Sequence, residues 1–459
     1  MPTTLLSSWK KLVRAAPQAT AVIEAAGEKV FSHAELAARA EAWRAARIEP
    51  LAGQRVVFAL PNSVAWFEVF LGLLQAGAVP AAIDATEPPA AQRELARAVG
   101  ATWLWSAGRL EKISAPRRPR RHDLCLLKIT SGSTGAPRAL PFTHAQILSD
   151  GRQVCRTMGI GPRDLNLAVI PLGHSYGLGN LVVPLLAQGT PLVCASAPMP
   201  HALAADCTRW RPTVFPAVPA LLRALAASDI SIDAWRSLRL VISAGAPLPA
   251  ETAQAFFAQT GRSPQAFYGT SETGGITFDR GGEATREGRS VGTPLAAVRL
   301  RFGRGRRFTV VSTAVVGGGK FSPADHAELN AHGELVLLGR AGRMVKIAGR
   351  RLDLTELEAA LRRVTGVRDA LAAPHPARPD ELAAALATDL PVNAVRNALR
   401  ERLAAWKIPR RIIVLPAFPL TSRGKTDTRA LQRLLHSKTE IQPRRNANEH
   451  AQPKAAFNH

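Results

Sequence analysis

The spacing of hydrophobic and polar positions alternates between two periods in the first hundred residues. Short apolar runs such as residues 54–60 have the composition of buried strands, whereas residues 32–47 and 62–77 repeat apolar positions at helical spacing. Strands that alternate with amphipathic helices are typical of βαβ units in a parallel, doubly wound sheet. Ser32 and Glu35 have the spacing of a capping box at the start of the first helix. The pattern predicts an α/β fold.

The same rhythm returns further along the chain. Apolar runs bounded by glycine, proline or a helical pattern occur at residues 165–172, 189–195, 212–218 and 238–245. We therefore predict one large N-terminal α/β domain with doubly wound sheets over residues 1–340.

The periodicity changes near the end of this domain. Residues 301–322 alternate in the β manner between glycine-rich turns, which favours an antiparallel piece. Residues 341–436 are predicted to form a small α+β domain with helices at 354–364 and 392–406. Residues 437–459 have almost no apolar periodicity and are predicted to be a disordered tail.

Length and composition exclude several classes of protein. At 459 residues the chain exceeds the roughly 250–300 residues at which one core stops growing, so it is no single small binding module. Hydrophobic residues make up 46% and charged residues 20%, which excludes overall disorder. The most apolar stretch, residues 56–83, is interrupted by Asn62, Glu68 and two prolines, so we predict no transmembrane segment.

The cysteines and the N-terminus bear on the compartment. Cys125, Cys155, Cys194 and Cys207 show no spacing typical of a zinc site or of a disulfide framework. The N-terminus lacks the apolar core of a secretory signal. Reduced thiols and a cytoplasmic location are the expectation.

The net charge points to anionic partners. Lys and Arg number 59 against 35 Asp and Glu, a formal net charge of +24. Nucleic acid, anionic lipid at a membrane surface, a nucleotide, coenzyme A or an acidic carrier protein would all suit that field. No helix-turn-helix or RNA-binding signature appears, so we predict no specific nucleic-acid partner. The basic cluster at residues 117–122 is interpreted as a solvated linker, with docking of an anionic carrier as the alternative.

A glycine- and hydroxyl-rich loop follows the apolar run at residues 124–129. Residues 130–135 read Thr-Ser-Gly-Ser-Thr-Gly, and Arg138 lies just beyond them. Small residues let a backbone approach an oligophosphate, and hydroxyl and N–H groups can donate to its oxygens. The loop matches neither the P-loop nor the GxGxxG pattern, and alone it could be an ordinary turn.

Further motifs follow in a fixed order. They are Tyr-Gly-Thr-Ser-Glu-Thr-Gly-Gly at 268–275, Gly-Arg at 339–340, and the segments 345–358 and 419–427. With this ordered set the chain resembles, from about Trp9 to Leu435, the adenylate-forming superfamily of acyl-CoA synthetases, peptide-synthetase adenylation domains and firefly luciferase.

The resemblance implies a site for Mg·ATP. It assigns Ser271 to the α-phosphate, Glu272 to Mg²⁺ and Asp325 to the ribose, while Tyr268 stacks on adenine. A carboxylate suits Mg²⁺, which prefers hard oxygen ligands. The remaining nucleotide-binding residues that it implies are Thr130, Ser131, Gly132, Ser133, Thr134, Gly135, Arg138, Gly245, Gly269, Thr270 and Arg340.

The resemblance also implies catalytic residues and a mobile small domain. Lys425 matches the lysine that meets the attacking carboxylate and the α-phosphate, where an ammonium stabilises developing negative charge. Gly342 falls at the interdomain hinge. His174 falls in the acyl-pocket segment, beside the bound carboxylate. No acidic residue lies next to His174 in sequence to pair with a substrate ammonium, which favours an acyl or aryl acid over an amino acid.

The function that this resemblance implies is an ATP-dependent ligase that activates a small carboxylic acid as an acyl-adenylate and transfers it to coenzyme A. Transfer to the phosphopantetheine of an acidic acyl carrier protein is one alternative, which the positive charge would suit. A non-catalytic nucleotide-binding protein is another, because residues 307–319 are compressed and Pro323 and Ala324 replace the usual Thr-Gly before Asp325.

Overall fold

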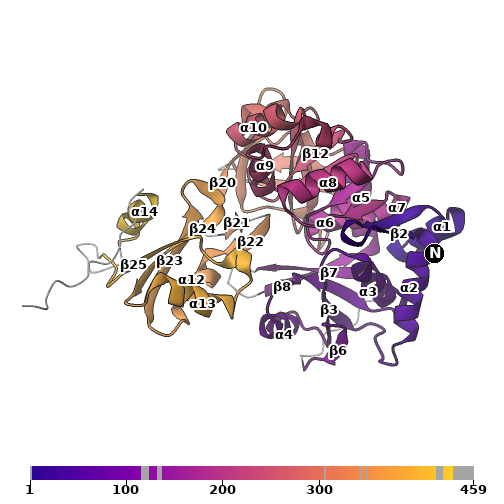
Figure 1. Cartoon of the computed structure of the whole chain (residues 1–459), viewed down its shortest axis with the longest axis horizontal. Helices are drawn as coiled ribbons and strands as arrows, with labels where there is room; N and C mark the ends of the chain where they lie inside the picture. The colour runs from indigo at the N-terminus through magenta and orange to yellow at the C-terminus, as the bar shows by residue number, and fades with distance from the viewer. Residues whose placement is uncertain are drawn as a thin grey trace, which may run out of the picture.

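The computed structural model describes residues 3–114, 123–131, 137–303, 306–340, 344–347, 349–419 and 427–437. Figure 1 shows a large body that contains the N-terminus and a smaller one built from the C-terminal part of the chain. Residues 132–135, Gly342, Lys425 and the 117–122 cluster lie outside the described residues.

The long sheet of the large body is mostly parallel. The strands from β13 to β1 run parallel to their neighbours, and the strands at each edge pair antiparallel. Its order is β15 (Thr293–Pro294), β14 (Gly274–Phe278), β13 (Pro264–Thr270), β12 (Leu240–Ser243), β11 (Val214–Ala217), β9 (Asn166–Ala168), β10 (Leu192–Cys194), β1 (Thr20–Glu24) and β2 (Lys29–Ser32). The predicted α/β fold is confirmed.

A second sheet and a hairpin complete the lower part of the large body in Figure 1. The second sheet has the order β4 (Val79–Ile83), β3 (Arg55–Ala59), β5 (Trp103–Ser106) and β6 (Arg109–Lys112). The hairpin pairs β7 (Leu124–Ser131) with β8 (Pro137–Thr143) and contacts β4.

Helices connect and cover these sheets. They are α1 (Leu5–Ala15), α2 (His33–Ala45), α3 (Val64–Gln75), α4 (Pro89–Ala98), α5 (His144–Met158), α6 (Ser175–Gly177), a π-helical turn (Leu178–Val182), α7 (Val183–Gln188), α8 (Pro200–Trp210), α9 (Pro219–Ala226), α10 (Ala250–Thr260) and α11 (Glu283–Glu287). The predicted capping box of Ser32 and Glu35 starts α2. Trp66, Phe67 and Phe70 of α3 are fully buried, because this helix packs inside the core.

The predicted antiparallel piece forms from β16 (Arg299–Phe302), β17 (Phe308–Val311) and β18 (Lys320–Phe321). The hairpin of β19 (Asp325–Leu329) and β20 (Leu335–Arg340) follows.

The small body combines a hairpin, a sheet and helices. The hairpin pairs β21 (Met344–Ile347) with β22 (Arg350–Asp353), and the sheet has the order β23 (Val367–His375), β24 (Arg378–Thr388) and β25 (Arg411–Leu415). The helices are α12 (Leu354–Arg362), α13 (Val392–Arg400) and α14 (Thr428–His436).

One predicted helix boundary is wrong. The helix expected over residues 392–406 ends at Arg400, and residues Ala405–Lys407 form a separate 3₁₀ turn. Trp406 stacks against Arg350, and Lys407 pairs with Glu87 of the large body. These tertiary contacts override the helical periodicity.

Within the described ranges, we find no helix that is both long and apolar enough to span a membrane. The four cysteines, Cys125, Cys155, Cys194 and Cys207, are buried and form no disulfide with one another.

Candidate functional site

Two predicted nucleotide-binding residues meet at the end of β13. Tyr268 is 6% exposed, and its hydroxyl donates a hydrogen bond of 2.8 Å to Oδ2 of Asp325, the first residue of β19. Gly245 has a φ of +95°, and a Cβ there would lie 2.4 Å from the Cα of Gly349. Only glycine fits at position 245 without displacing the backbone of the small body.

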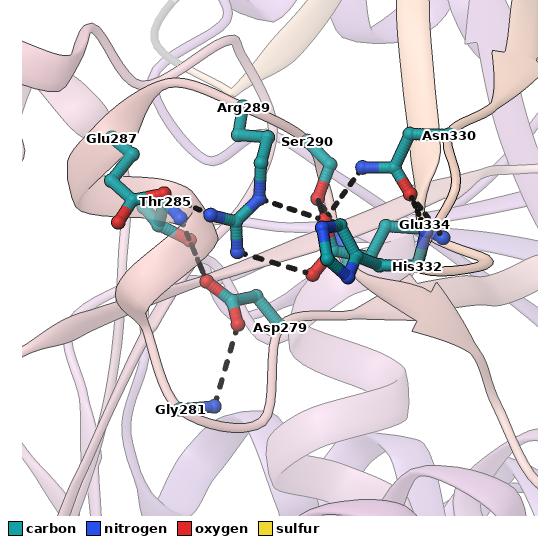
Figure 2. Close-up of polar contacts among 10 residues, drawn as sticks. Asp279, Gly281, Thr285, Glu287, Arg289, Ser290, Asn330, His332 and Glu334 are labelled. Atoms are coloured by element: carbon teal, nitrogen blue, oxygen red, sulfur yellow. Dashed lines mark hydrogen bonds and ion pairs between the residues drawn. The ribbon is translucent and has the colours of Figure 1, made fainter.

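A polar network, drawn in Figure 2, holds the hairpin that carries Asp325. The carboxylate of Glu334 accepts hydrogen bonds from Arg289, Ser290 and Asn330. These groups hold the pKa of Glu334 at about 2, against its ordinary value of 4.5. The backbone of Val291 donates to the carbonyl of Leu335, which joins the hairpin to the large sheet.

A second polar cluster lies beside α11. Asp279 accepts hydrogen bonds from the backbone of Gly281 and from both the backbone and the hydroxyl of Thr285 (Figure 2). Across the hairpin itself, Asp325 and Arg340 are register partners. The residue predicted to contact the ribose and a second predicted nucleotide-binding residue therefore lie opposite each other on the backbone. The side chain of Arg340 is outside the described part.

The predicted magnesium ligand is engaged by the small body. Nη1 of Arg351 donates to both carboxylate oxygens of Glu272, at 2.8 and 3.1 Å. Burial disfavours the charged carboxylate, but Arg351 and the local hydrogen bonds outweigh it and lower the pKa of Glu272. The carboxylate is therefore held ionised, as a metal ligand must be.

The donor set around Glu272 fits magnesium held together with a nucleotide. Within the described ranges, no cluster of three or more His, Cys, Asp or Glu side chains could hold a metal by itself. Mg²⁺ at phosphate sites takes only one or two carboxylates and completes its shell with phosphate oxygens and water. Glu272 can fill that role once its contact with Arg351 is released.

The ends of the predicted phosphate loop lie side by side. Thr130, which is buried, and Arg138 are register partners across the β7–β8 hairpin. Ser131 is the last residue of β7, and its side chain belongs to the part left undescribed, as does the loop 132–135.

A cavity of about 560 Å³ opens beside this hairpin. Thr130, His174 and Ser271, which come from three separate sequence motifs, all line it. A smaller cavity of about 50 Å³ adjoins it, and His174, Ser175, Ser271 and Arg351 line both. The smaller cavity also touches Gly245, Gly269 and Thr270.

His174 is neutral at physiological pH. Burial lowers its pKa to about 4, and the neighbouring Arg350 adds to this effect. A neutral imidazole can accept a hydrogen bond at one ring nitrogen while it donates at the other.

The sequence prediction missed a buried ion pair next to the cavities. Nζ of Lys128 lies 3.9 Å from Oδ2 of Asp150 and donates to Oγ of Ser175 at 3.0 Å. Burial lowers the pKa of Lys128 and raises that of Asp150. A lone lysine in the otherwise apolar run 124–129 was a readable signal, whereas nothing in the sequence singles out Asp150.

Contacts between the two bodies were also missed. Arg350 pairs with Asp84 at the end of β4, and Lys407 Nζ lies 2.7 Å from Glu87. Lys346 Nζ lies 5.8 Å from the ring centroid of Tyr268 and donates to the carbonyl of Gly269. The sequence motif at residues 345–358 pointed to this segment but did not assign these side chains.

The predicted catalytic lysine belongs to a segment that the structure leaves undescribed. Lys425 lies between Pro419 and Asp427, and the backbone N–H of Asp427 donates to the carbonyl of Pro419 at 2.7 Å. In Figure 1, α14, which begins just after Asp427, lies at the outer end of the small body, away from the large one. The roles of Lys425 and Gly342 stay predictions.

Comparison with known proteins defines the class. Residues 9–115 and 102–302 match the AMP-binding enzyme family. Together the two matched ranges span more than half of the chain. The chain belongs to this family, as the motifs predicted.

The chain is similar to several characterised members. It is 27% identical to the feruloyl-CoA synthase of an Amycolatopsis species, over 92% of this chain and 97% of that protein. It is 28% identical to the phenyloxazoline synthase of Mycolicibacterium paratuberculosis, over 92% of this chain and 41% of that protein. The solved structure of an amide bond synthetase from Marinactinospora thermotolerans has the same fold, with a TM-score of 0.81 at 21% identity, covering 94% of this chain and 99% of that one.

Proposed function

We propose that this protein is an ATP-dependent ligase that activates an acyl or aryl carboxylic acid as its adenylate and transfers the acyl group to the thiol of coenzyme A. The observation that carries this proposal is that Thr130, His174 and Ser271, from three separate motifs of the family, line one cavity. Tyr268 and Asp325, which hydrogen-bond to each other, would bind the nucleotide.

In the first half of the reaction, a carboxylate oxygen of the acid attacks the α-phosphorus of ATP. A new P–O bond forms, the bond to the bridging oxygen breaks, and pyrophosphate leaves. The hydroxyls of Thr130 and Ser271 can donate to phosphate oxygens, and the ammonium of Lys425 stabilises negative charge that develops at the α-phosphate. Magnesium held by Glu272 would neutralise charge on the phosphates.

In the second half, a thiol sulfur attacks the acyl carbon of the adenylate. The C–S bond forms, AMP departs with the C–O electron pair, and the thiol proton passes to solvent. Dividing the reaction in this way replaces one difficult displacement by two easier ones. Neutral His174 lines both cavities and can orient the substrate carboxylate without adding a charge.

The acceptor has a second candidate. The net charge of +24 would attract an acidic carrier protein, and the phenyloxazoline synthase to which the chain is similar is more than twice as long as the matched region. Coenzyme A, itself an anion, suits the same field. Feruloyl-CoA synthase, which matches along nearly its whole length, favours coenzyme A.

The test is acid-dependent release of pyrophosphate from Mg·ATP, with no thiol, with coenzyme A and with a holo carrier protein. We expect release that requires an acid and is accelerated by coenzyme A. If only the carrier protein accelerates the reaction, the acceptor is the carrier protein and not coenzyme A. If ATP binds but no acid releases pyrophosphate, the non-catalytic alternative holds instead.

A further inference from the structure

A π-helical turn forms one wall of the smaller cavity. It spans Leu178–Val182 between α6 and α7, and its residues Gly179 and Asn180 line the cavity. Single π-helical turns are rare and occur most often at functional sites.

The side-chain oxygen of Asn180 has no hydrogen-bond partner among the residues that the structure describes. The side chain is 0% exposed, and its Nδ2 donates only a long contact of 3.6 Å to Sδ of Met158. Its Oδ1 accepts no hydrogen bond from any residue in the described part of the chain. A buried amide oxygen without a donor costs about 1–3 kcal/mol, so its retention beside a cavity points to a donor that arrives with a ligand.

A second acceptor lines the same cavity. Asp150 receives a hydrogen bond from the backbone N–H of Gly275 at Oδ1, and its Oδ2 faces Lys128 at 3.9 Å. A Cβ at Gly274 would lie 2.1 Å from Oδ1 of Asp150, so this glycine makes room for the carboxylate. Because Lys128 already balances the charge of Asp150, the pair suits a neutral donor better than a substrate ammonium.

One part of the cavity wall is apolar and suits a flat ring, whereas Thr270, Ser271, Lys346 and Arg351 make another part polar. Val154, Ala244 and Phe267 line the apolar part, and so does Tyr176, whose hydroxyl is already engaged with the carbonyl of Ile242 at 3.1 Å. Tyr176 and Phe267 touch each other, with their ring centroids 5.9 Å apart. Aromatic walls favour an aromatic ligand through edge and stacking contacts.

The two cavities set the orientation of the ligand. His174, which is expected to lie beside the substrate carboxylate, lines both cavities, whereas Asn180 lines only the smaller one. An acid held by its carboxylate at His174 can therefore extend into the smaller cavity with its far end toward Asn180.

We propose that the substrate is an aromatic carboxylic acid with a hydroxyl group on the ring, at the end away from the carboxylate. That hydroxyl donates a hydrogen bond to Oδ1 of Asn180, and Asp150 lines the same cavity. This inference rests on the proposed function, because it names the acid which that activity consumes.

The first test compares matched acids with the wild-type protein. Pyrophosphate release is measured with 4-hydroxycinnamate, cinnamate and 4-methoxycinnamate, and in parallel with the corresponding benzoates. We expect kcat/KM to be about 10- to 100-fold higher for the hydroxy acid than for its unsubstituted and methoxy counterparts. Equal values for all three would overturn the inference and leave the ligase intact. No release with any acid, aliphatic acids included, would instead remove the proposed function.

The second test places the selectivity at Asn180. In Asn180→Leu, we expect the ratio of kcat/KM for the hydroxy acid to that for the unsubstituted acid to fall by about 10- to 100-fold. Asn166→Leu is the matched control, because Asn166 is also fully buried with an amide that lacks partners in the described chain, and it lines neither cavity. Its ratio should equal that of the wild type. An unchanged ratio in Asn180→Leu, or an equal fall in both variants, would contradict the role given to Asn180. If Asn180→Leu does not fold, the comparison of acids with the wild-type protein still tests whether the substrate carries a ring hydroxyl.

Discussion

The two bodies of the molecule supply the site in different ways. The large body builds the predicted nucleotide surface from its own residues, since Tyr268 hydrogen-bonds to Asp325 on a hairpin that Glu334 anchors. The small body contacts the large body through ion pairs. Arg350 pairs with Asp84, and Arg351 pairs with Glu272, the predicted magnesium ligand. The large body is therefore expected to bind nucleotide by itself. The small body is expected to contribute to the site through Arg350 and Arg351, whose ion pairs can form with other partners.

The largest expected effect comes from the small body. Lys425→Ala should lower acid-dependent pyrophosphate release by about 100- to 1,000-fold, because it removes a positive charge that acts on the transition state. The dissociation constant for ATP should stay nearly unchanged, since the large body is expected to hold the nucleotide. Lys320→Ala, an exposed lysine of β18, is the control and should behave as the wild type. Equal activity of both variants would remove Lys425 from the mechanism.

The nucleotide surface of the large body comes next. Asp325→Ala should raise the KM for ATP by about 10- to 100-fold, because hydrogen bonds to a charged group contribute about 1.5–3 kcal/mol. Tyr268→Phe removes only the hydroxyl that donates to Asp325 and keeps the ring, so we expect a smaller increase. Steady-state kinetics with varied ATP measure both. A larger increase in the KM for ATP in Tyr268→Phe than in Asp325→Ala would contradict the assignment of the ribose contact to Asp325.

The contact between the bodies should compete with magnesium. In this arrangement Arg351 occupies both carboxylate oxygens of Glu272. Arg351→Gln should therefore lower the Mg²⁺ concentration for half-maximal pyrophosphate release by a few-fold, roughly the effect of losing one partly buried ion pair. Glu272→Gln should raise that concentration. Titration curves that coincide for the wild type and both variants would show that Glu272 is no magnesium ligand.

The smallest effect concerns stability of the hairpin. Glu334→Gln should lower the free energy of unfolding by about 1–2 kcal/mol, because it weakens charge-assisted hydrogen bonds from Arg289 and its neighbours. Since folding lowers the pKa of Glu334 to about 2, its contribution is complete above pH 4.5 and is lost as the pH falls toward 2.

Denaturant unfolding at pH 7 and pH 3 measures this difference. Glu287→Gln is the control, because Glu287 is exposed and pairs with the same arginine. A gap between the two variants that is as large at pH 3 as at pH 7 would contradict the role given to Glu334.

The local pattern predicted much of the fold. The short apolar run at residues 54–60 predicted the strand at Arg55–Ala59, and the capping box of α2 lies where Ser32 and Glu35 placed it. The end of α13 could not be predicted, because it depends on contacts that are distant in sequence. Lys407 pairs with Glu87, more than three hundred positions earlier, and Trp406 packs against Arg350 of the β21–β22 hairpin.

The candidate site was predicted only where a motif carries it. The pairing of Tyr268 with Asp325 brings together two residues that the motifs had singled out. Asp150 and Asn180 lie on ordinary-looking helical stretches, and their importance arises from what the fold places around them. A buried oxygen without a donor is a property of three-dimensional packing, which no single sequence displays.

The most direct measurement is acid-dependent exchange of labelled pyrophosphate into ATP, with Mg²⁺ present and no thiol added. We predict exchange that requires an aromatic acid, is fastest with a ring-hydroxylated acid, and disappears in Lys425→Ala. Absence of exchange with every acid, in protein that still binds ATP, would contradict the central claim that this molecule forms an acyl-adenylate.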